Sequence, residues 1–293
     1  MKIAIASGKG GTGKTTVAAN LARVFSRLGI QVAYIDCDVE APNGHLFLKP
    51  HITGHESATI PVPQIDPELC TRCGTCGRFC RYNALLCLPL QVIPFPELCH
   101  GCGGCGLVCP AGAIREVPRE IGSIDLGEAG SIAFAGGLLN IGEAMSPPLI
   151  KALKARAGTK KVTLVDAPPG TSCPVIESIR DCDYVALVTE PTPFGLNDLQ
   201  LAVEMVRALG LPFGVILNRA GRNDRPLLDY CSEQRINLLA QFPDDRRVAV
   251  AYSRGELISE VLPEFRARFS SLAAAIATSV KPGLRFDGRR IRS

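Results

Sequence analysis

Short apolar runs alternate along most of the chain with longer segments whose apolar residues recur every three or four positions. Runs of the first kind predict buried strands, and segments of the second kind predict amphipathic helices. The predicted strands are 2–7, 31–36, 161–166, 183–189, 213–218 and 236–242. The predicted helices are 15–29, 147–157, 197–210, 226–235 and 257–280. This order predicts an α/β fold with a doubly wound, mostly parallel sheet and helices on both of its faces.

Residues 61–118 interrupt this alternation with a segment rich in cysteine, glycine and proline. A chain of 293 residues is long enough for one large core and a small second module. We therefore predict a discontinuous α/β domain over 1–60 and 119–280, an inserted domain over 61–118 and a basic tail over 281–293. The stretch that holds His45, His51 and His55 shows no clear periodicity, which predicts a loop.

Thirteen cysteines are present, and eight of them form two runs with the spacing C-x2-C-x2-C-x3-C. The chain starts as a short strand and a loop, which differs from an export signal, so we expect a cytoplasmic protein whose thiols are free to bind metal. Zinc is the alternative, but zinc sites draw four ligands as two pairs, and these runs do not divide in that way. The eight residues are Cys70, Cys73, Cys76, Cys80, Cys99, Cys102, Cys105 and Cys109.

In this spacing, three cysteines of a run bind one [4Fe-4S] cluster and the fourth binds the other cluster. The predicted ligands are Cys70, Cys73, Cys76 and Cys109 for cluster one, and Cys99, Cys102, Cys105 and Cys80 for cluster two. Residues 66–118, with the ending CPAGAI, resemble the bacterial two-cluster ferredoxins, which implies an inserted small α+β ferredoxin domain. Arg81 departs from that pattern, where proline is usual, but this change removes no ligand.

A glycine-rich loop joins the first predicted strand to the first predicted helix. It fits the pattern G-x4-G-K-T, in which backbone N–H groups surround phosphates, Lys14 contacts the β and γ oxygens and Thr15 binds Mg²⁺. The same letters also spell G-x-G-x-x-G, and Asp36 follows the next strand, where a dinucleotide-binding domain reads a ribose. The predicted nucleotide contacts are Gly8, Gly10, Gly11, Thr12, Gly13, Lys14, Thr15 and Thr16.

Two later strand ends favour a nucleoside triphosphate over a dinucleotide. Asp166 ends the strand 161–166, and a carboxylate there is the Mg²⁺ partner that hydrolysis requires and hydride transfer does not. Beyond Asn218, residues 219–221 offer no carboxylate to accept the donors of guanine, which favours ATP. Asn218 then lies near the base, or alternatively it only caps the end of its strand.

The loop KGGTGKTT carries a second lysine, Lys9, and resembles the phosphate loop of the MinD superfamily, which includes the nitrogenase iron protein and the Mrp-type cluster carriers. This resemblance covers residues 1–60 and 119–280. It implies that Lys9 contacts the phosphates of a partner subunit in a nucleotide-dependent homodimer, or in a heterodimer with a related ATPase. DCDVEAPN resembles the first switch, which puts Asp38 near Mg²⁺ and the attacking water, and DAPPG resembles the second switch, which ends at Gly170. The residues implied to flank adenine are Pro191, Phe242 and Pro243.

The chain also departs from these relatives. It lacks the C-terminal C-x-x-C of the Mrp carriers, and Pro282 and Gly283 break the chain where MinD relatives have a membrane helix. Cys173 follows the second switch, as a cluster cysteine of the nitrogenase iron protein does, but 110–165 contain no second cysteine for a bridging cluster. The net charge of +4 is spread along the chain and no apolar run is long enough to span a bilayer, so we expect neither a nucleic-acid nor a membrane partner.

Three functions are compatible with these features. The first is an ATPase that couples nucleotide hydrolysis to electron transfer from two [4Fe-4S] clusters to a redox partner. The second is an ATPase that assists the assembly of an iron–sulfur or metal cofactor in a partner protein. The third is a positioning switch like MinD. Lys9, Lys14, Asp38 and Asp166 are the predicted catalytic residues, with Thr15, Asp38 and Asp166 around Mg²⁺. Because the insertion follows Asp36 and Asp38, the nucleotide state could move the clusters.

Overall fold

The computed structural model describes all residues except 159, 281–284, 288, 289 and 293. The chain divides into two compact units. The large unit comprises Met1–His55, Ile124–Leu138 and Ile150–Ser293, and the small unit comprises Glu56–Ser123 and Leu139–Leu149. The predicted insertion, 61–118, lies within the first segment of the small unit, which extends beyond it on both sides. The prediction did not include the second segment, Leu139–Leu149. Of the predicted tail, only the paired strands β12 (Arg285–Asp287) and β13 (Arg290–Arg292) are described, and the rest lies outside the described residues.

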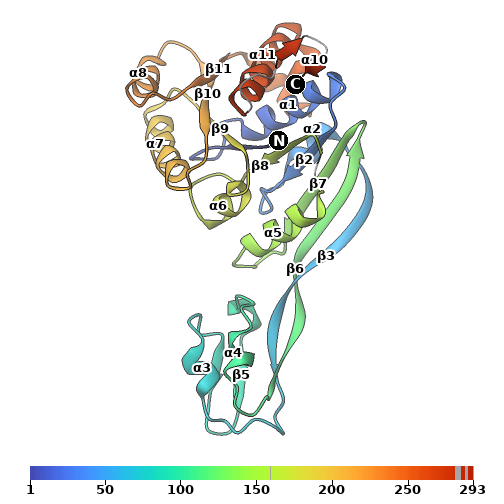
Figure 1. Cartoon of the computed structure of the whole chain (residues 1–293), viewed down its shortest axis with the longest axis vertical. Coiled ribbons are helices and arrows are strands. Elements are labelled where there is room, and N and C mark those ends of the chain that lie inside the picture. Colours follow the sequence, from blue (N-terminus) through green and yellow to red (C-terminus); the bar gives the residue numbers. More distant parts are fainter. Residues whose placement is uncertain (159, 281–284, 288–289, 293) are drawn as a thin grey trace. The chain divides into compact units, whose positions relative to one another are not determined.

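Nine strands form one sheet in the order β11-β10-β9-β1-β8-β2-β7-β6-β3 (Figure 1). Every neighbouring pair from β11 to β7 is parallel, which confirms the predicted α/β class and its mostly parallel sheet. The strands are β1 Lys2–Ala6, β2 Val32–Asp36, β3 His51–Ile65, β6 Ile114–Ala129, β7 Ile132–Leu139, β8 Val162–Asp166, β9 Tyr184–Thr189, β10 Phe213–Ala220 and β11 Leu238–Pro243.

Helices cover both faces of the parallel part of the sheet. On one face, α1 contacts α10 and α11, and their buried residues join Ile3 and Ile5 in the main core. The alternate residues Ala4 and Ala6 are also buried, and on their side α6 contacts β1 and α7 contacts β9. The helices are α1 Lys14–Arg27, α2 Gly44–Leu48, α5 Pro147–Arg156, α6 Cys173–Ile179, α7 Pro193–Ala208, α8 Arg225–Glu233, α9 Arg246–Ser253, α10 Ile258–Val261 and α11 Pro263–Val280.

The strand register brings three loops together at one edge of the sheet. Asp166 pairs with Ile5 on one side and with Asp36 on the other, so β1, β8 and β2 end at the same level. The N–H of Cys37 donates to the carbonyl of Asp166 (2.9 Å), and the N–H of Ala167 donates to that of Ile5 (3.0 Å). The glycine-rich loop and both aspartate segments therefore meet at this edge, where α/β sheets commonly bind ligands.

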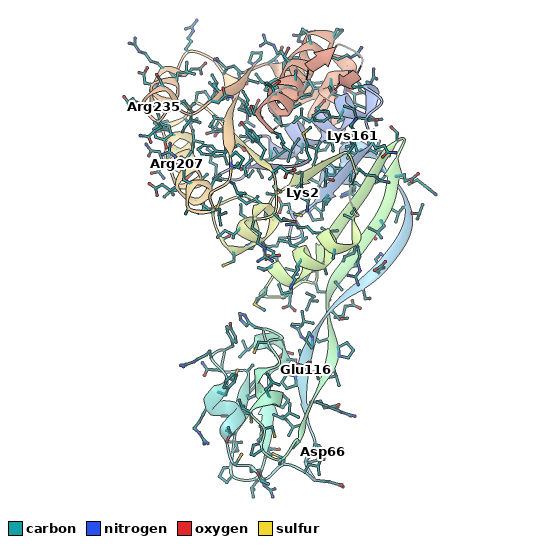
Figure 2. The ribbon with its side chains drawn as sticks, in the orientation of Figure 1. Lys2, Asp66, Glu116, Lys161, Arg207 and Arg235 are labelled. Atoms are coloured by element: carbon teal, nitrogen blue, oxygen red, sulfur yellow. The ribbon has the colours of Figure 1, made fainter. Side chains whose placement is uncertain are left out.

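The small unit has short elements around its cysteines. They are α3 Thr75–Phe79, β4 Leu85–Cys87, β5 Val92–Pro94, the 3-10 helix Pro96–Leu98 and α4 Gly104–Leu107. β4 and β5 form an antiparallel pair, and α3 contacts α4. Asp66, labelled in Figure 2, follows β3, and its N–H donates to the carbonyl of Ala113 (2.8 Å), which ties the start of this segment to its end.

Two sequence-based predictions were wrong in detail. His51 and His55 lie in β3 and His45 lies in α2, although a loop was predicted there. β3 is the last strand of the sheet and is exposed at most of its first positions, so its polar residues and prolines show no buried pattern. The predicted helix 257–280 is two helices, because Pro263 has no N–H to continue α10 and instead begins α11.

Candidate functional site

The phosphate-type loop lies between β1 and α1, and its backbone geometry requires glycine. Gly11 and Gly13 have φ angles of 78° and 94°, which side-chain-bearing residues rarely adopt. A Cβ atom on Gly8 would lie 2.1 Å from the carbonyl oxygen of Asp198, and one on Gly13 would lie 2.4 Å from Nδ2 of Asn218. The hydroxyl of Ser7 also donates to the carbonyl of Lys9 (2.6 Å). The loop is therefore closely packed against α7 and β10.

Three carboxyl groups lie beside this loop. Asp36 is fully buried, and its Oδ2 accepts a hydrogen bond from the N–H of Gly44 (2.8 Å). Oδ2 of Asp166 accepts one from the hydroxyl of Tyr34 (2.8 Å), but its Oδ1 is buried without a hydrogen-bond partner. Asp38 is half-buried. A buried carboxylate oxygen that lacks a partner is suited to bind a cation.

The electrostatics of these groups also fit a divalent cation. Burial raises the pKa of Asp166, and the nearby charge of Lys14 opposes this only in part. Burial and the nearby Asp166 raise the pKa of Asp36, and burial raises the pKa of Asp38 to about 6. A bound Mg²⁺ would offset the cost of keeping these carboxyl groups ionised. The chemistry of Thr15, Asp38 and Asp166, the predicted Mg²⁺ ligands, is therefore compatible with a bound Mg²⁺.

Lys9, the second lysine of the loop, takes part in an ion-pair cluster. Its Nζ lies 2.5 Å from Oε1 of Glu190, and Nη1 of Arg219 lies 2.7 Å from Oε2 of the same carboxylate. The side chain of Glu190 is only 11% exposed. In this structure Glu190 therefore holds Lys9 within its own subunit and neutralises part of the charge of both cations.

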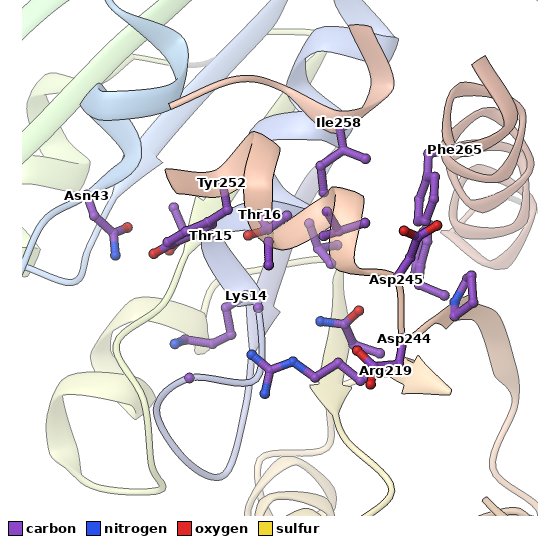
Figure 3. A pocket seen from close by; sticks show the side chains of 18 of the residues that line it. Lys14, Thr15, Thr16, Asn43, Arg219, Asp244, Asp245, Tyr252, Ile258 and Phe265 are labelled. Atoms are coloured by element: carbon purple, nitrogen blue, oxygen red, sulfur yellow. The ribbon is translucent and has the colours of Figure 1, made fainter. Parts of the chain in front are cut away.

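A cavity of about 380 Å³ extends from the loop toward β11, α9 and α11 (Figure 3). Its phosphate end contains Lys14 and Thr15, and its far end contains apolar side chains that suit a purine base. Asn218 also lines the cavity, and its Nδ2 donates to the carbonyl of Thr12 (2.8 Å). The predicted residues that line the cavity are Gly10, Gly11, Gly13, Lys14, Thr15, Thr16, Asp38, Asn218, Phe242 and Pro243.

The other predicted nucleotide-site residues do not line this cavity. Gly8 packs against Asp198, Thr12 and Asp166 are buried, and the N–H of Gly170 donates to the carbonyl of Ser7 (2.9 Å). Lys9 points to Glu190, and Pro191 follows that residue. Tyr34 and Glu190 were not predicted. Tyr34 lies within an apolar strand, and nothing in the sequence marks it as a site residue. Glu190 is an acidic residue directly after β9, and that position could have indicated a charged partner at this edge of the sheet.

The small unit contains two hollows, and each is lined by four cysteines. The first is lined by Cys70, Cys73, Cys76 and Cys109. The second is lined by Cys80, Cys99, Cys102 and Cys105. Each hollow thus combines three cysteines of one run with the last cysteine of the other. Among the described residues, no group of three or more His, Cys, Asp or Glu side chains is arranged to hold a single metal ion.

The backbone around the hollows suits sulfur ligands of a larger group. Gly74 (φ 73°) and Gly103 (φ 70°) are the N-cap residues of the short helices α3 and α4, where the chain turns around the cysteines. The N–H of Gly101 lies 3.4 Å from Sγ of Cys99, and that of Ala113 lies 3.3 Å from Sγ of Cys109. Such N–H groups stabilise thiolates. The donor sets therefore fit two four-cysteine clusters.

The five remaining cysteines differ in their surroundings. Cys37, Cys182 and Cys231 are buried in the large unit, as expected of small apolar residues. Cys173 is exposed at the start of α6, and Cys87 is half-buried in β4.

His100 stacks on Tyr82 with ring centroids 3.4 Å apart, and both residues line the second hollow.

Comparison with known proteins identifies the family. The model of the CobQ/CobB/MinD/ParA nucleotide binding domain matches residues 3–258, so the chain belongs to this family. The uncharacterized protein MJ0579 of Methanocaldococcus jannaschii is 32% identical over 87% of this chain and 90% of its own length. An iron-sulfur cluster carrier protein of Aquifex aeolicus is 25% identical over 95% of this chain and 68% of its own length.

Solved structures support the same fold. The septum site-determining protein MinD of Pyrococcus horikoshii, complexed with Mg-ADP, superposes with a TM-score of 0.60 at 21% identity. The match covers 94% of this chain and 95% of that protein. Within the described residues, no helix has the length and apolar character needed to cross a membrane.

Proposed function

We propose that this protein binds and hydrolyses Mg·ATP and couples its nucleotide state to electron transfer from two [4Fe-4S] clusters to a partner protein. The observation that carries the redox part is the composition of the two hollows. Each holds three cysteines of one run and the fourth of the other, as the spacing of two-cluster ferredoxins requires. The clusters would supply one-electron chemistry, and the chain would supply the eight thiolates.

The nucleotide part of the proposal rests on the large unit. Lys14 and the loop N–H groups would bind the phosphates, and Thr15 with Asp166 would hold Mg²⁺. Asp38, which lines the cavity, would position the attacking water. The apolar end of the cavity near Phe242 and Pro243 would hold the adenine.

The proposal includes a nucleotide-dependent dimer. Glu190 pairs with Lys9 within one subunit. A bound triphosphate would offer this lysine a more highly charged partner than a single carboxylate, so Lys9 would leave Glu190 and contact the phosphates across a dimer. A homodimer and a heterodimer with a related ATPase are both compatible with this role.

The test is the midpoint potential of each cluster, measured by EPR-monitored titration of anaerobically prepared protein with ADP and with a non-hydrolysable ATP analogue. We expect a nucleotide-dependent shift of about 60 mV, which corresponds to about 1.4 kcal/mol of coupling for one electron. Iron and sulfide contents well below two clusters per chain would contradict the redox proposal itself. Equal potentials with both nucleotides would contradict the coupling.

A second candidate function is assistance in assembling an iron–sulfur cofactor, because relatives of this chain are named iron-sulfur cluster carrier proteins. The two candidates differ in what happens to the iron. Reconstituted protein would be mixed with an apo-ferredoxin, separated from it and assayed for iron. Electron transfer predicts that the chain keeps its iron through repeated reduction and oxidation, whereas assembly predicts ATP-dependent loss of iron to the acceptor.

A further inference from the structure

One cysteine outside the two runs lies against a predicted cluster ligand. Sγ of Cys87 is 3.7 Å from Sγ of Cys76, which is buried and lines the first hollow. Cys87 is half-buried at the end of β4, and it is the only one of the five remaining cysteines that belongs to the small unit. Cys76 therefore has a second thiol in contact with it, from a strand that does not line the hollow.

The surrounding chain makes room for this contact. A Cβ atom on Gly77 would lie only 2.7 Å from Sγ of Cys87, so glycine at this position allows the thiol to approach α3. The pairing of Cys87 with Val92 holds β4 against β5, which keeps the thiol beside the helix. A disulfide bond requires a sulfur separation of about 2.0 Å, so a movement of less than 2 Å would join the two sulfurs.

We propose that Cys76 and Cys87 form an oxidation site that closes to a disulfide when the first hollow has lost its cluster. This inference rests on the proposed function in that Cys76 is otherwise a cluster ligand. The oxidant is a peroxide. The thiol of Cys87, the more exposed of the two, attacks hydrogen peroxide, so that the O–O bond breaks and the sulfur becomes a sulfenic acid. The thiol proton passes to the leaving hydroxide, which departs as one water. Sγ of Cys76 then displaces the sulfenic oxygen as a second water and forms the S–S bond.

The consequence is specific to one of the two cluster sites. The disulfide removes Cys76 from the ligand set of the first hollow, so a cluster cannot be rebuilt there until a dithiol reduces the bond. The second hollow is lined by its four cysteines, and within the described chain no further cysteine lines it. Oxidation would therefore prevent the first hollow from binding a cluster and leave the second able to bind one.

The first test detects the Cys76–Cys87 disulfide directly in the wild-type chain. Iron is removed with a chelator, the protein is treated with one equivalent of hydrogen peroxide, and free thiols are alkylated. Cleavage after Arg78, Leu86 and Leu90 without reductant separates the two cysteines, and tandem mass spectrometry assigns the linked pair. A Cys76–Cys87 link as the main product is expected. Other pairings, or over-oxidised cysteines without this link, would overturn the proposal.

The second test uses Cys87→Ser, with Cys231→Ser in the large unit as the matched control. After peroxide treatment, iron and sulfide are returned without a thiol reductant, and the linked peptide is followed in the same samples. Wild type and the control should recover about half of their iron, whereas Cys87→Ser should recover nearly all of it. Equal recovery in all three would overturn the proposal. Iron content before treatment tests the proposed function separately, because the disulfide is detected in iron-free protein.

Discussion

At the scale of single residues, Asp166 is the carboxyl group whose surroundings best suit a cation. Its Oδ1 is buried without a hydrogen-bond partner, and burial raises its pKa. Asp166→Asn should lower Mg²⁺-dependent ATP hydrolysis by on the order of 100-fold or more, because the metal loses an anionic ligand. Without nucleotide, the same variant should be as stable as wild type or more stable, because a buried charge is gone. Hydrolysis assays and urea unfolding measure the two effects.

The control for this prediction is Asp229→Asn, which changes an exposed carboxylate on α8 and should alter neither quantity. A marked loss of stability in Asp166→Asn would show that the ionised carboxylate supports the fold through contacts other than a cation. Full hydrolytic activity in Asp166→Asn would exclude this residue from the Mg²⁺ site.

Glu190 joins two cations in one ion-pair cluster beside the phosphate-type loop. It lies between two cations, and its removal leaves Lys9 and Arg219 close together. We expect Glu190→Gln to lower the free energy of unfolding by about 1–2 kcal/mol at low salt, a value kept small because both cations are partly solvated. Glu177→Gln is the matched control, because Glu177 is similarly buried and, among the described residues, forms an ion pair with Arg180 alone. An equal loss in both variants would contradict a special role for the cluster.

At the scale of elements, the phosphate loop packs on α7, and this packing gives Gly8 and Gly10 different surroundings although both belong to the same glycine-rich motif. A Cβ atom on Gly8 would meet backbone of α7 at 2.1 Å, whereas one on Gly10 would have no neighbour within 4 Å. Gly8→Ala should therefore lower the free energy of unfolding by about 2 kcal/mol or more, and Gly10→Ala should change it by less than about 0.5 kcal/mol. Unfolding of the nucleotide-free protein measures this difference. Equal effects would show that the loop does not pack on α7 as described.

The elements also show how far the sequence could predict the molecule. β1 and β8 are buried on both faces, so each has a continuous apolar run that predicts a strand. The predicted site residues follow the ends of these strands. β3 and β6 were missed because their many exposed positions carry polar residues. Glu190 was missed because ion pairing depends on which strand ends are neighbours, and that follows only from the order of the sheet.

At the scale of the whole molecule, the two kinds of site belong to different units. Every residue that lines the nucleotide cavity lies in the large unit, and both four-cysteine hollows lie in the small unit. Because no lining residue is shared, loss of one kind of site should leave the other formed. Lys14→Ala tests this in one direction, since Lys14 is buried at the phosphate end of the cavity.

Lys14→Ala should lower ATP hydrolysis by on the order of 100-fold or more, because the positive charge beside the transferred phosphoryl group is lost. Its iron and sulfide contents and its visible absorption should equal those of wild type. The reciprocal variant, Cys76→Ser with Cys102→Ser, should lose the chromophore but still bind a fluorescent ATP analogue with wild-type affinity. A colourless Lys14→Ala protein would contradict the separation of the two sites and would mean that cluster assembly itself needs a nucleotide-competent large unit.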